Sequence, residues 1–137
     1  MILGIGIDLV DIRRIQKILD RYPDTFVRRF FSEKERTHGC THPKKAAHYA
    51  KRFAAKEAFI KAIGGLKGVS LKDIWVANQS TGQPHIVLSE KAGQILWPQG
   101  CRPDIFVSLT DEFPYAQAIV ILLKKTLYPI ESECFPS

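Results

Sequence analysis

Two short stretches of the chain carry side chains that could bind a hard cation and a phosphate group. Asp8 lies near the end of the apolar run Ile2–Leu9, and Glu57 and Lys61 stand four residues apart within Arg52–Gly65. On a helix that spacing places Glu57 and Lys61 on one face. Two carboxylates with a lysine and an arginine can hold a divalent cation such as Mg²⁺ against phosphate oxygens.

Each of these residues also has an ordinary structural interpretation. Asp8 could end a strand or cap the helix that follows it. Glu57 and Lys61 could form an exposed ion pair worth only about 0.3–0.5 kcal/mol. Arg52 and Lys56 fit a solvated helix face. Taken one at a time, the residues favour these structural interpretations over a catalytic one.

The run Ile2–Leu9 predicts a buried strand. Its odd-numbered residues Leu3, Ile5, Ile7 and Leu9 would share one apolar face, and Gly4, Gly6 and Asp8 would share the other together with Ile2. Two glycines beside Asp8 leave room for a ligand or another backbone to approach closely.

A basic amphipathic helix is predicted directly after this strand. Asp11 can cap it, and Pro23 ends it. Its apolar stripe consists of Ile12, Ile15, Ile18, Leu19 and Tyr22, and its basic residues are Arg13, Arg14, Lys17 and Arg21. The basic face is either the solvated side of the helix or a docking surface for an acidic partner.

The remaining pattern predicts several further elements. A short helix over 24–31 precedes a capping box at Ser32–Glu35, and a loop is expected at 37–43. A long helix runs from Lys44 to about Ile63 and stops at Gly64. The later elements are strands at Ile74–Asn78, His85–Leu88, Asp104–Leu109 and Ala116–Leu123, and a helix at Ser89–Leu96. This order predicts an α+β fold: a single compact domain with a largely antiparallel sheet packed against the long helix.

Length, charge and cysteine content narrow the class of protein. The chain has 137 residues, 45% of them hydrophobic, and a formal net charge of +6, which favours one globular domain with an anionic partner. Three widely spaced cysteines without a CxxC pair make a disulfide framework unexpected. No apolar run reaches the about 20 residues of a membrane helix, and the first residues carry no basic segment. We therefore expect a cytoplasmic protein without a membrane partner.

Other metal and nucleotide motifs are weak or missing. His38, Cys40 and His42 alternate on a short loop, but no second cluster of ligands accompanies them, so zinc is not expected. The sequence contains neither GxxxxGK[ST] nor GxGxxG, so an ordinary nucleotide-binding loop is not predicted.

Taken together, the chain resembles the holo-acyl-carrier-protein synthases, which are small 4′-phosphopantetheinyl transferases. Asp8 combined with Lys56, Glu57 and Lys61 is the specific part of the match. The matching segments are Gly4–Asp8 with Arg14, Phe30–Ser32 with Glu35, Arg52–Gly64, Gly82 with Pro84, and Ser108–Thr110. They cover residues 1 to about 124 in the order of the family, so we expect a transferase domain over 1–124 and an irregular extension over 125–137.

The resemblance implies a reaction and a set of roles. Such enzymes transfer phosphopantetheine from coenzyme A to a serine of acyl carrier protein in fatty acid biosynthesis, and leave adenosine 3′,5′-bisphosphate. By resemblance, Asp8 and Glu57 hold Mg²⁺, and Glu57 and Lys61 act in catalysis. The residues implied for the cofactor are Lys44, Arg52, Lys61, Gly64 and Ser108, and those implied for the carrier protein are Arg14, Arg21, Phe26 and Arg29.

The resemblance further implies a homotrimer with active sites between subunits, and no nucleic-acid partner. One departure is Asp111, which stands where many family members have a histidine that can contact the cofactor. The proton acceptor for the serine is left open between Glu57 and a metal-positioned water. Two other functions also stay open: a binding module for nucleic acid or acidic proteins, and a phosphohydrolase that uses the same metal site.

Overall fold

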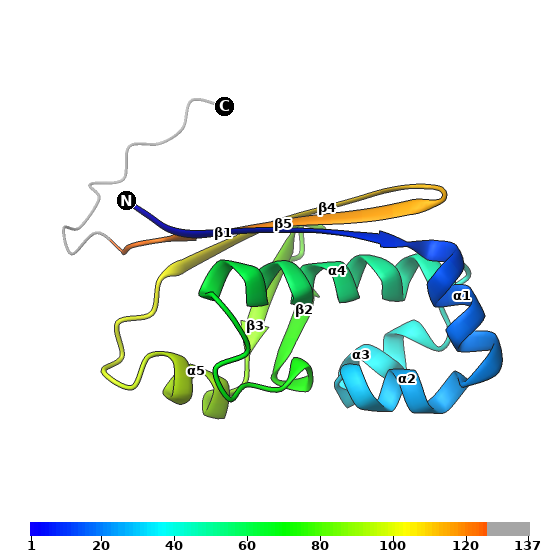
Figure 1. Cartoon of the computed structure of the whole chain (residues 1–137), viewed down its shortest axis with the longest axis horizontal. Helices are drawn as coiled ribbons and strands as arrows, with labels where there is room; N and C mark the ends of the chain where they lie inside the picture. Colours follow the sequence, from blue (N-terminus) through cyan, green and yellow to red (C-terminus); the bar gives the residue numbers. More distant parts are fainter. Residues whose placement is uncertain (126–137) are drawn as a thin grey trace.

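The structure is a computed structural model and describes residues 1–125 (Figure 1). Its strands and helices alternate irregularly, with most strands in the second half. The elements are β1 (Ile2–Asp11), α1 (Ile12–Arg21), α2 (Pro23–Phe30), α3 (Glu33–Gly39), α4 (Lys45–Ile63), the 3-10 turn η1 (Leu71–Asp73), β2 (Ile74–Asn78), β3 (Pro84–Leu88), α5 (Glu90–Leu96), β4 (Asp104–Glu112) and β5 (Tyr115–Leu123).

A three-stranded sheet packs on the long helix α4. Its strand order is β1-β5-β4, and both pairings are antiparallel. Figure 1 shows α4 running along one face of this sheet, with α1 at one end. A separate two-stranded antiparallel hairpin, β2-β3, packs beside α4, and its strand β3 contacts the edge strand β4.

Two glycines allow α4 to lie against β1. A Cβ atom at Gly4 would collide with the carbonyl oxygen of Ala62, and one at Gly6 would collide with that of Ala58. Because successive strand residues alternate between faces, Asp8 points toward α4 with these glycines. The close approach expected from the glycines is therefore that of another backbone, and it places Asp8 beside α4.

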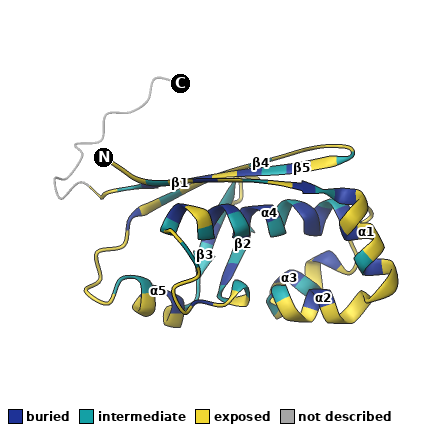
Figure 2. Ribbon diagram, viewed as in Figure 1, coloured by how far each residue is buried: buried dark blue, intermediate teal, exposed yellow. Residues whose placement is uncertain are grey.

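The core surrounds α4 on several sides. Small residues, Ala54, Ala58 and Ala62, are buried along the helix, and large ones, Tyr49 and Phe59, are almost fully enclosed. Burying an aromatic or aliphatic side chain of this size contributes about 1.5–3 kcal/mol. Figure 2 shows α4 as mostly buried between the sheet and the smaller elements.

Most of the expected elements are confirmed, with shifted boundaries. Asp11 caps α1 by accepting a hydrogen bond from the Arg13 amide, and Ser32 and Glu35 form the predicted capping box of α3. Gly64 ends α4 at a φ of 85°, which favours glycine. Two details differ: α3 extends into the loop predicted at 37–43, and the strands form two sheets instead of one.

The burial predicted for β1 is wrong. Leu3, Ile5, Ile7 and Leu9 are 51–60% exposed, because they lie on the sheet face that points away from α4. No described element packs on that face (Figures 1 and 2). An alternating apolar pattern identifies the strand but does not reveal which face the same chain covers.

Within residues 1–125, no helix is long and apolar enough to span a bilayer. Cys40 and Cys101 are exposed and carry free thiols. The irregular extension predicted for 125–137 lies outside the described residues except for Lys125.

Candidate active site

Lys61 connects the long helix to the first strand. Its Nζ atom donates to the carbonyl oxygen of Ile7 at 2.9 Å and to Asp8 Oδ1 at 3.1 Å. The Asp8 side chain is 17% exposed and that of Lys61 is 54% exposed, so the contact lies at the edge of the α4–β1 interface and is open to solvent. Lys61 thus pairs with Asp8 instead of forming the helical ion pair with Glu57.

Glu57 lies close to both of these residues. Burial raises the pKa of Glu57, the charge of Asp8 raises it further, and Lys61 lowers it. The fold therefore brings together Asp8, Glu57 and Lys61, as the sequence predicted from two separate segments. Two carboxylates and one ammonium in partial shelter form a site suited to a cation and a phosphate group.

A cavity of about 530 Å³ opens beside Glu57. Its walls come from the end of α2, from α4 and from the segment before and within η1. The lining residues are Arg29, Phe30, Glu57, Ile60, Leu66, Val69, Ser70 and Leu71. Because most of these side chains are apolar, the cavity could accept the uncharged part of a ligand whose phosphates lie near Asp8 and Lys61.

The residues expected to bind the cofactor are dispersed. Gly64 lies one turn beyond Lys61 at the end of α4, and Lys44 is exposed at the opposite end of that helix. In the sheet register Ser108 stands opposite Ile119 of β5, and Ile119 stands opposite Ile7 of β1. Ser108 therefore shares the exposed sheet face with Ile7, and Asp8 lies on the other face. One chain therefore does not bring all of these residues to a single point.

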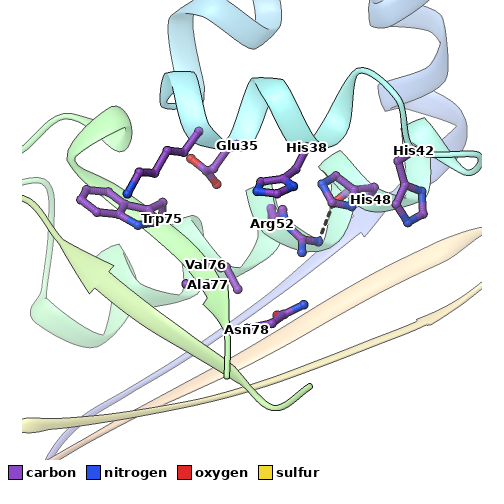
Figure 3. A pocket seen from close by; sticks show the side chains of 10 residues that line it. Glu35, His38, His42, His48, Arg52, Trp75, Val76, Ala77 and Asn78 are labelled. Carbon is purple, nitrogen blue, oxygen red and sulfur yellow. Dashed lines mark hydrogen bonds between the residues drawn. The ribbon is translucent and has the colours of Figure 1, made fainter. Parts of the chain in front are cut away.

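Arg52 lies in a second cavity of about 490 Å³, which shares no lining residue with the cavity beside Glu57. Figure 3 shows Arg52 among three histidines and the strand β2, with His38 and His42 on one side and Asn78 on the other. The Arg52 guanidinium donates to the carbonyl oxygen of His48 at 3.5 Å. Burial lowers the pKa of Arg52.

His48 is buried in the same cavity, and the sequence analysis did not identify it. It is 7% exposed, and its Nε2 atom has no hydrogen-bond partner among the described residues. Burial, with the positive charge of Arg52, lowers the pKa of His48 to about 3, so the ring is neutral. Within residues 1–125, no three histidine, cysteine, aspartate or glutamate side chains are grouped to hold a metal ion.

Asp111 is accounted for by a different contact. Its Oδ1 atom lies 2.9 Å from Lys51 Nζ, which joins β4 to α4. The position therefore carries an ion pair in this chain, in place of the histidine that many family members have.

Three of the four residues expected to face a carrier protein are exposed. Arg14 and Arg21 lie on the outer side of α1, and Arg29 lies near the end of α2. Phe26 differs from the expectation, because it is 7% exposed and packs against Phe30, Phe31 and Phe53. It is a core residue that joins α2 to α4.

Lys56 is the main residue that sequence reasoning misplaced. It was expected on a solvated face, yet it is fully buried, with its Nζ atom 2.6 Å from Glu35 Oε1. The signal was present in the helical spacing, since Lys56 follows Tyr49 by seven residues and precedes Ile60 by four. That spacing puts it on the apolar stripe of the helix.

Comparison with known proteins identifies the family to which this chain belongs. The model of the 4′-phosphopantetheinyl transferase superfamily matches residues 4–118, and the chain belongs to this superfamily. Within it, the chain is similar to the holo-[acyl-carrier-protein] synthases. That of Caulobacter vibrioides (strain NA1000) is 52% identical over an alignment of 127 residues, and the match covers 89% of this chain and 96% of the relative.

Solved structures of such synthases share the fold. The crystal structure of the Neisseria meningitidis enzyme has a TM-score of 0.83 and 32% identity, and the match covers 90% of this chain and 100% of that one. The Bacillus anthracis synthase, solved in complex with CoA (3′,5′-ADP), has a TM-score of 0.75 and 33% identity over 91% of this chain and 99% of that one.

Proposed function

We propose that this chain transfers the 4′-phosphopantetheine group of coenzyme A to a serine of apo acyl carrier protein. The serine oxygen forms a bond to the phosphorus nearest the pantetheine, the pyrophosphate P–O bond breaks, and adenosine 3′,5′-bisphosphate leaves. The serine proton passes to a base. The observation that carries this proposal is the meeting of Asp8, Glu57 and Lys61 at the α4–β1 contact in a chain of this superfamily.

The donor set fits magnesium. Mg²⁺ prefers oxygen ligands and is commonly held by one or two carboxylates together with substrate phosphates. Asp8 lies close enough to Glu57 for its charge to raise the pKa of Glu57. Two protein carboxylates are sufficient for such a site. When bound, the cation would neutralise charge on the pyrophosphate oxygens.

The chain's own residues supply position and proton transfer. Lys61 is half exposed at the mouth of the site, so its ammonium can turn from Asp8 to a phosphate oxygen. Glu57 is a candidate proton acceptor, because its partly buried carboxylate lies within the proposed site. A water molecule is the alternative acceptor.

We also propose that the active site is shared between two copies of the chain in a homotrimer. Arg52 and Ser108 both lie apart from Asp8 within one chain, in a separate cavity and on the opposite sheet face respectively. If Ser108 contacts the same coenzyme A molecule as Asp8, it must come from a neighbouring copy, and we assign Arg52 to that copy as well. Such a division is typical of ligand sites at subunit interfaces.

The exposed sheet face supports this assembly. Leu3, Ile5, Ile7 and Leu9 form an apolar row on β1, and Phe106 on β4 is 54% exposed beyond it. A contiguous apolar surface of this kind is unfavourable in water and is commonly covered by another subunit. A second copy of the chain has the same apolar face to offer, so copies can bury these faces together.

Complementation tests the shared site. We expect an Asp8→Ala chain co-expressed with an Arg52→Ala chain to recover transfer activity, because some assemblies then contain one intact composite site. Each variant expressed alone should be inactive. A monomer that keeps full specific activity at micromolar concentration, seen by light scattering during the assay, would contradict both the trimer and the shared site.

Transfer itself is tested by mass spectrometry of the carrier. Incubation of the protein with coenzyme A, Mg²⁺ and apo acyl carrier protein should add one phosphopantetheine to the carrier, and EDTA should prevent this. A binding module would instead show salt-sensitive binding without any need for Mg²⁺.

We place the reaction in the cytoplasm, because the cysteine usage is that of a reduced compartment.

A further inference from the structure

The buried ammonium of Lys56 makes three hydrogen bonds. Its Nζ atom donates to the carbonyl oxygen of Phe30 at 2.7 Å, to Glu35 Oε1 at 2.6 Å and to the carbonyl oxygen of Leu71 at 3.0 Å. A lysine ammonium has three protons, so its donor capacity is fully used. The same nitrogen lies over the Phe31 ring, 4.6 Å from its centroid.

These partners come from three separate segments. Phe30 ends α2, Glu35 lies in the first turn of α3, and Leu71 begins η1. Phe30 and Leu71 both line the cavity beside Glu57, the residue that follows Lys56 on α4. One side chain therefore holds two walls of the cavity next to a residue of the proposed active site.

The chemistry of Lys56 suits this role better than a purely structural one. Two of its three acceptors are backbone carbonyls, which an apolar side chain could not satisfy. Glu35 balances the charge, and its Oε1 atom also accepts from the Ser32 amide. Buried ion pairs can often be replaced by neutral side chains without loss of stability, so stability alone gives little reason for a lysine here.

We propose that Lys56 is a positioning residue that holds Phe30 and Leu71 at a fixed separation across the cavity beside Glu57. A substrate in that cavity is thereby aligned with Asp8, Glu57 and Lys61. This inference rests on the proposed function. Phosphoryl transfer depends chiefly on alignment, and a displacement of about 1 Å can cost about 100-fold in rate.

The test compares a variant that removes only the charge of Glu35 with a variant that removes the charges of both Glu35 and Lys56. Glu35→Gln removes one charge but keeps an oxygen for Ser32 and Lys56, so both carbonyl contacts of Lys56 persist. The double variant Lys56→Met with Glu35→Gln removes both charges and both carbonyl contacts. We expect kcat for transfer to be near the wild-type value in the single variant and about 10–100-fold lower in the double variant. The apparent Mg²⁺ affinity should be unchanged in both, because Asp8 and Glu57 are intact.

Hydrogen exchange gives a readout that does not depend on activity. The amides of Phe31, Val69 and Asp73 donate to Val27, Leu66 and Ser70, within the two walls. These amides should exchange faster in the double variant than in Glu35→Gln, while the amides of β5 exchange at the same rate in both variants. If wild-type protein showed no transfer from coenzyme A, the proposed function would fail, and this exchange result would still decide whether Lys56 holds the walls.

Two results would overturn the proposal. One is a folded double variant with the kcat and exchange rates of Glu35→Gln. The other is a loss of kcat in Glu35→Gln as large as in the double variant, which would assign the effect to the charge pair. Should the double variant not fold, Lys56→Leu with Glu35→Gln, which also removes both carbonyl contacts, replaces it, and wild-type kcat and exchange in that protein would equally overturn the proposal.

Discussion

Lys61 Nζ lies 3.1 Å from Asp8 Oδ1, a contact between residues 53 positions apart in the chain. The contact exists because two glycines on β1 let α4 approach the strand closely. The side chains of Lys61 and Asp8 can then meet. Glu57 lies one turn earlier on the same helix, and the charges of Asp8 and Lys61 both shift its pKa. The α4–β1 contact is thus the structural basis of the proposed site.

Removal of either carboxylate should abolish magnesium-dependent transfer. We expect Asp8→Ala and Glu57→Ala each to lower kcat by about 10²–10³-fold or more, the loss typical of removing a group that stabilises transition-state charge. Thermal unfolding should show folded proteins. Asp104→Ala, which removes an exposed carboxylate on β4, is the matched control and should keep wild-type activity. Full activity in a folded Asp8 or Glu57 variant would contradict the assignment.

A methyl group at Gly6 should damage both stability and activity. The added Cβ collides with the carbonyl oxygen of Ala58, so α4 must move away from β1. We expect Gly6→Ala to destabilise the protein by about 1–3 kcal/mol, as overpacking of a core does, and to lower kcat further by separating Asp8 from Lys61. Gly100→Asn is the control, because that site is open and its φ of 81° is one that asparagine tolerates. Chemical denaturation of both variants measures the difference, and an unchanged midpoint in Gly6→Ala would refute the packing argument.

The outer side of α1 should matter for the carrier protein more than for coenzyme A. Within residues 1–125, Arg13 is paired with Asp11 at 2.7 Å, whereas Arg14 is exposed and makes no ion pair. We expect Arg14→Glu to raise the KM for the carrier about tenfold at low salt, and the effect to shrink as salt screens the charges. Lys91→Glu on α5 should have little effect. A change confined to the KM for coenzyme A would show that α1 is not the docking surface.

The lowered pKa of the buried His48 should make the protein less stable in acid. Its pKa is lowered to about 3 in the folded protein from an ordinary value of 6.5, so between these values the unfolded chain binds a proton that the folded chain does not. Stability contributed by the neutral ring is complete above about pH 6.5 and falls with pH below it, by up to about 1.4 kcal/mol per pH unit. His48→Phe should remove this slope between pH 6 and 4 in urea titrations. An identical slope in the variant would show that His48 does not carry the effect.

Much of this fold could be predicted from local sequence, because helix caps and periodicity act over a few residues. Asp11, the capping box at Ser32 and the stop at Gly64 all occur as expected. Burial across elements was harder to predict. The apolar row on β1 is exposed in one chain, and Lys56 is enclosed by partners 15, 21 and 26 positions away that no local pattern connects to it.

The candidate site, too, was predictable only where local sequence signals determine it. Glu57 and Lys61 could be placed on one face because a helical spacing of four is a local signal, whereas Asp8 could be grouped with them only through the resemblance to the family. The separation of Arg52 and Ser108 from Asp8 could not be predicted, because it depends on which sheet face and which helix side each residue occupies.

The most direct test of the account is to measure both products of one reaction. With wild-type protein, coenzyme A, Mg²⁺ and apo acyl carrier protein, we predict one adenosine 3′,5′-bisphosphate released for each phosphopantetheine found on the carrier by mass spectrometry. A carrier whose acceptor serine is replaced by alanine should give neither product. Release of adenosine 3′,5′-bisphosphate without modification of the carrier would show that water is the acceptor and would contradict the proposed transfer.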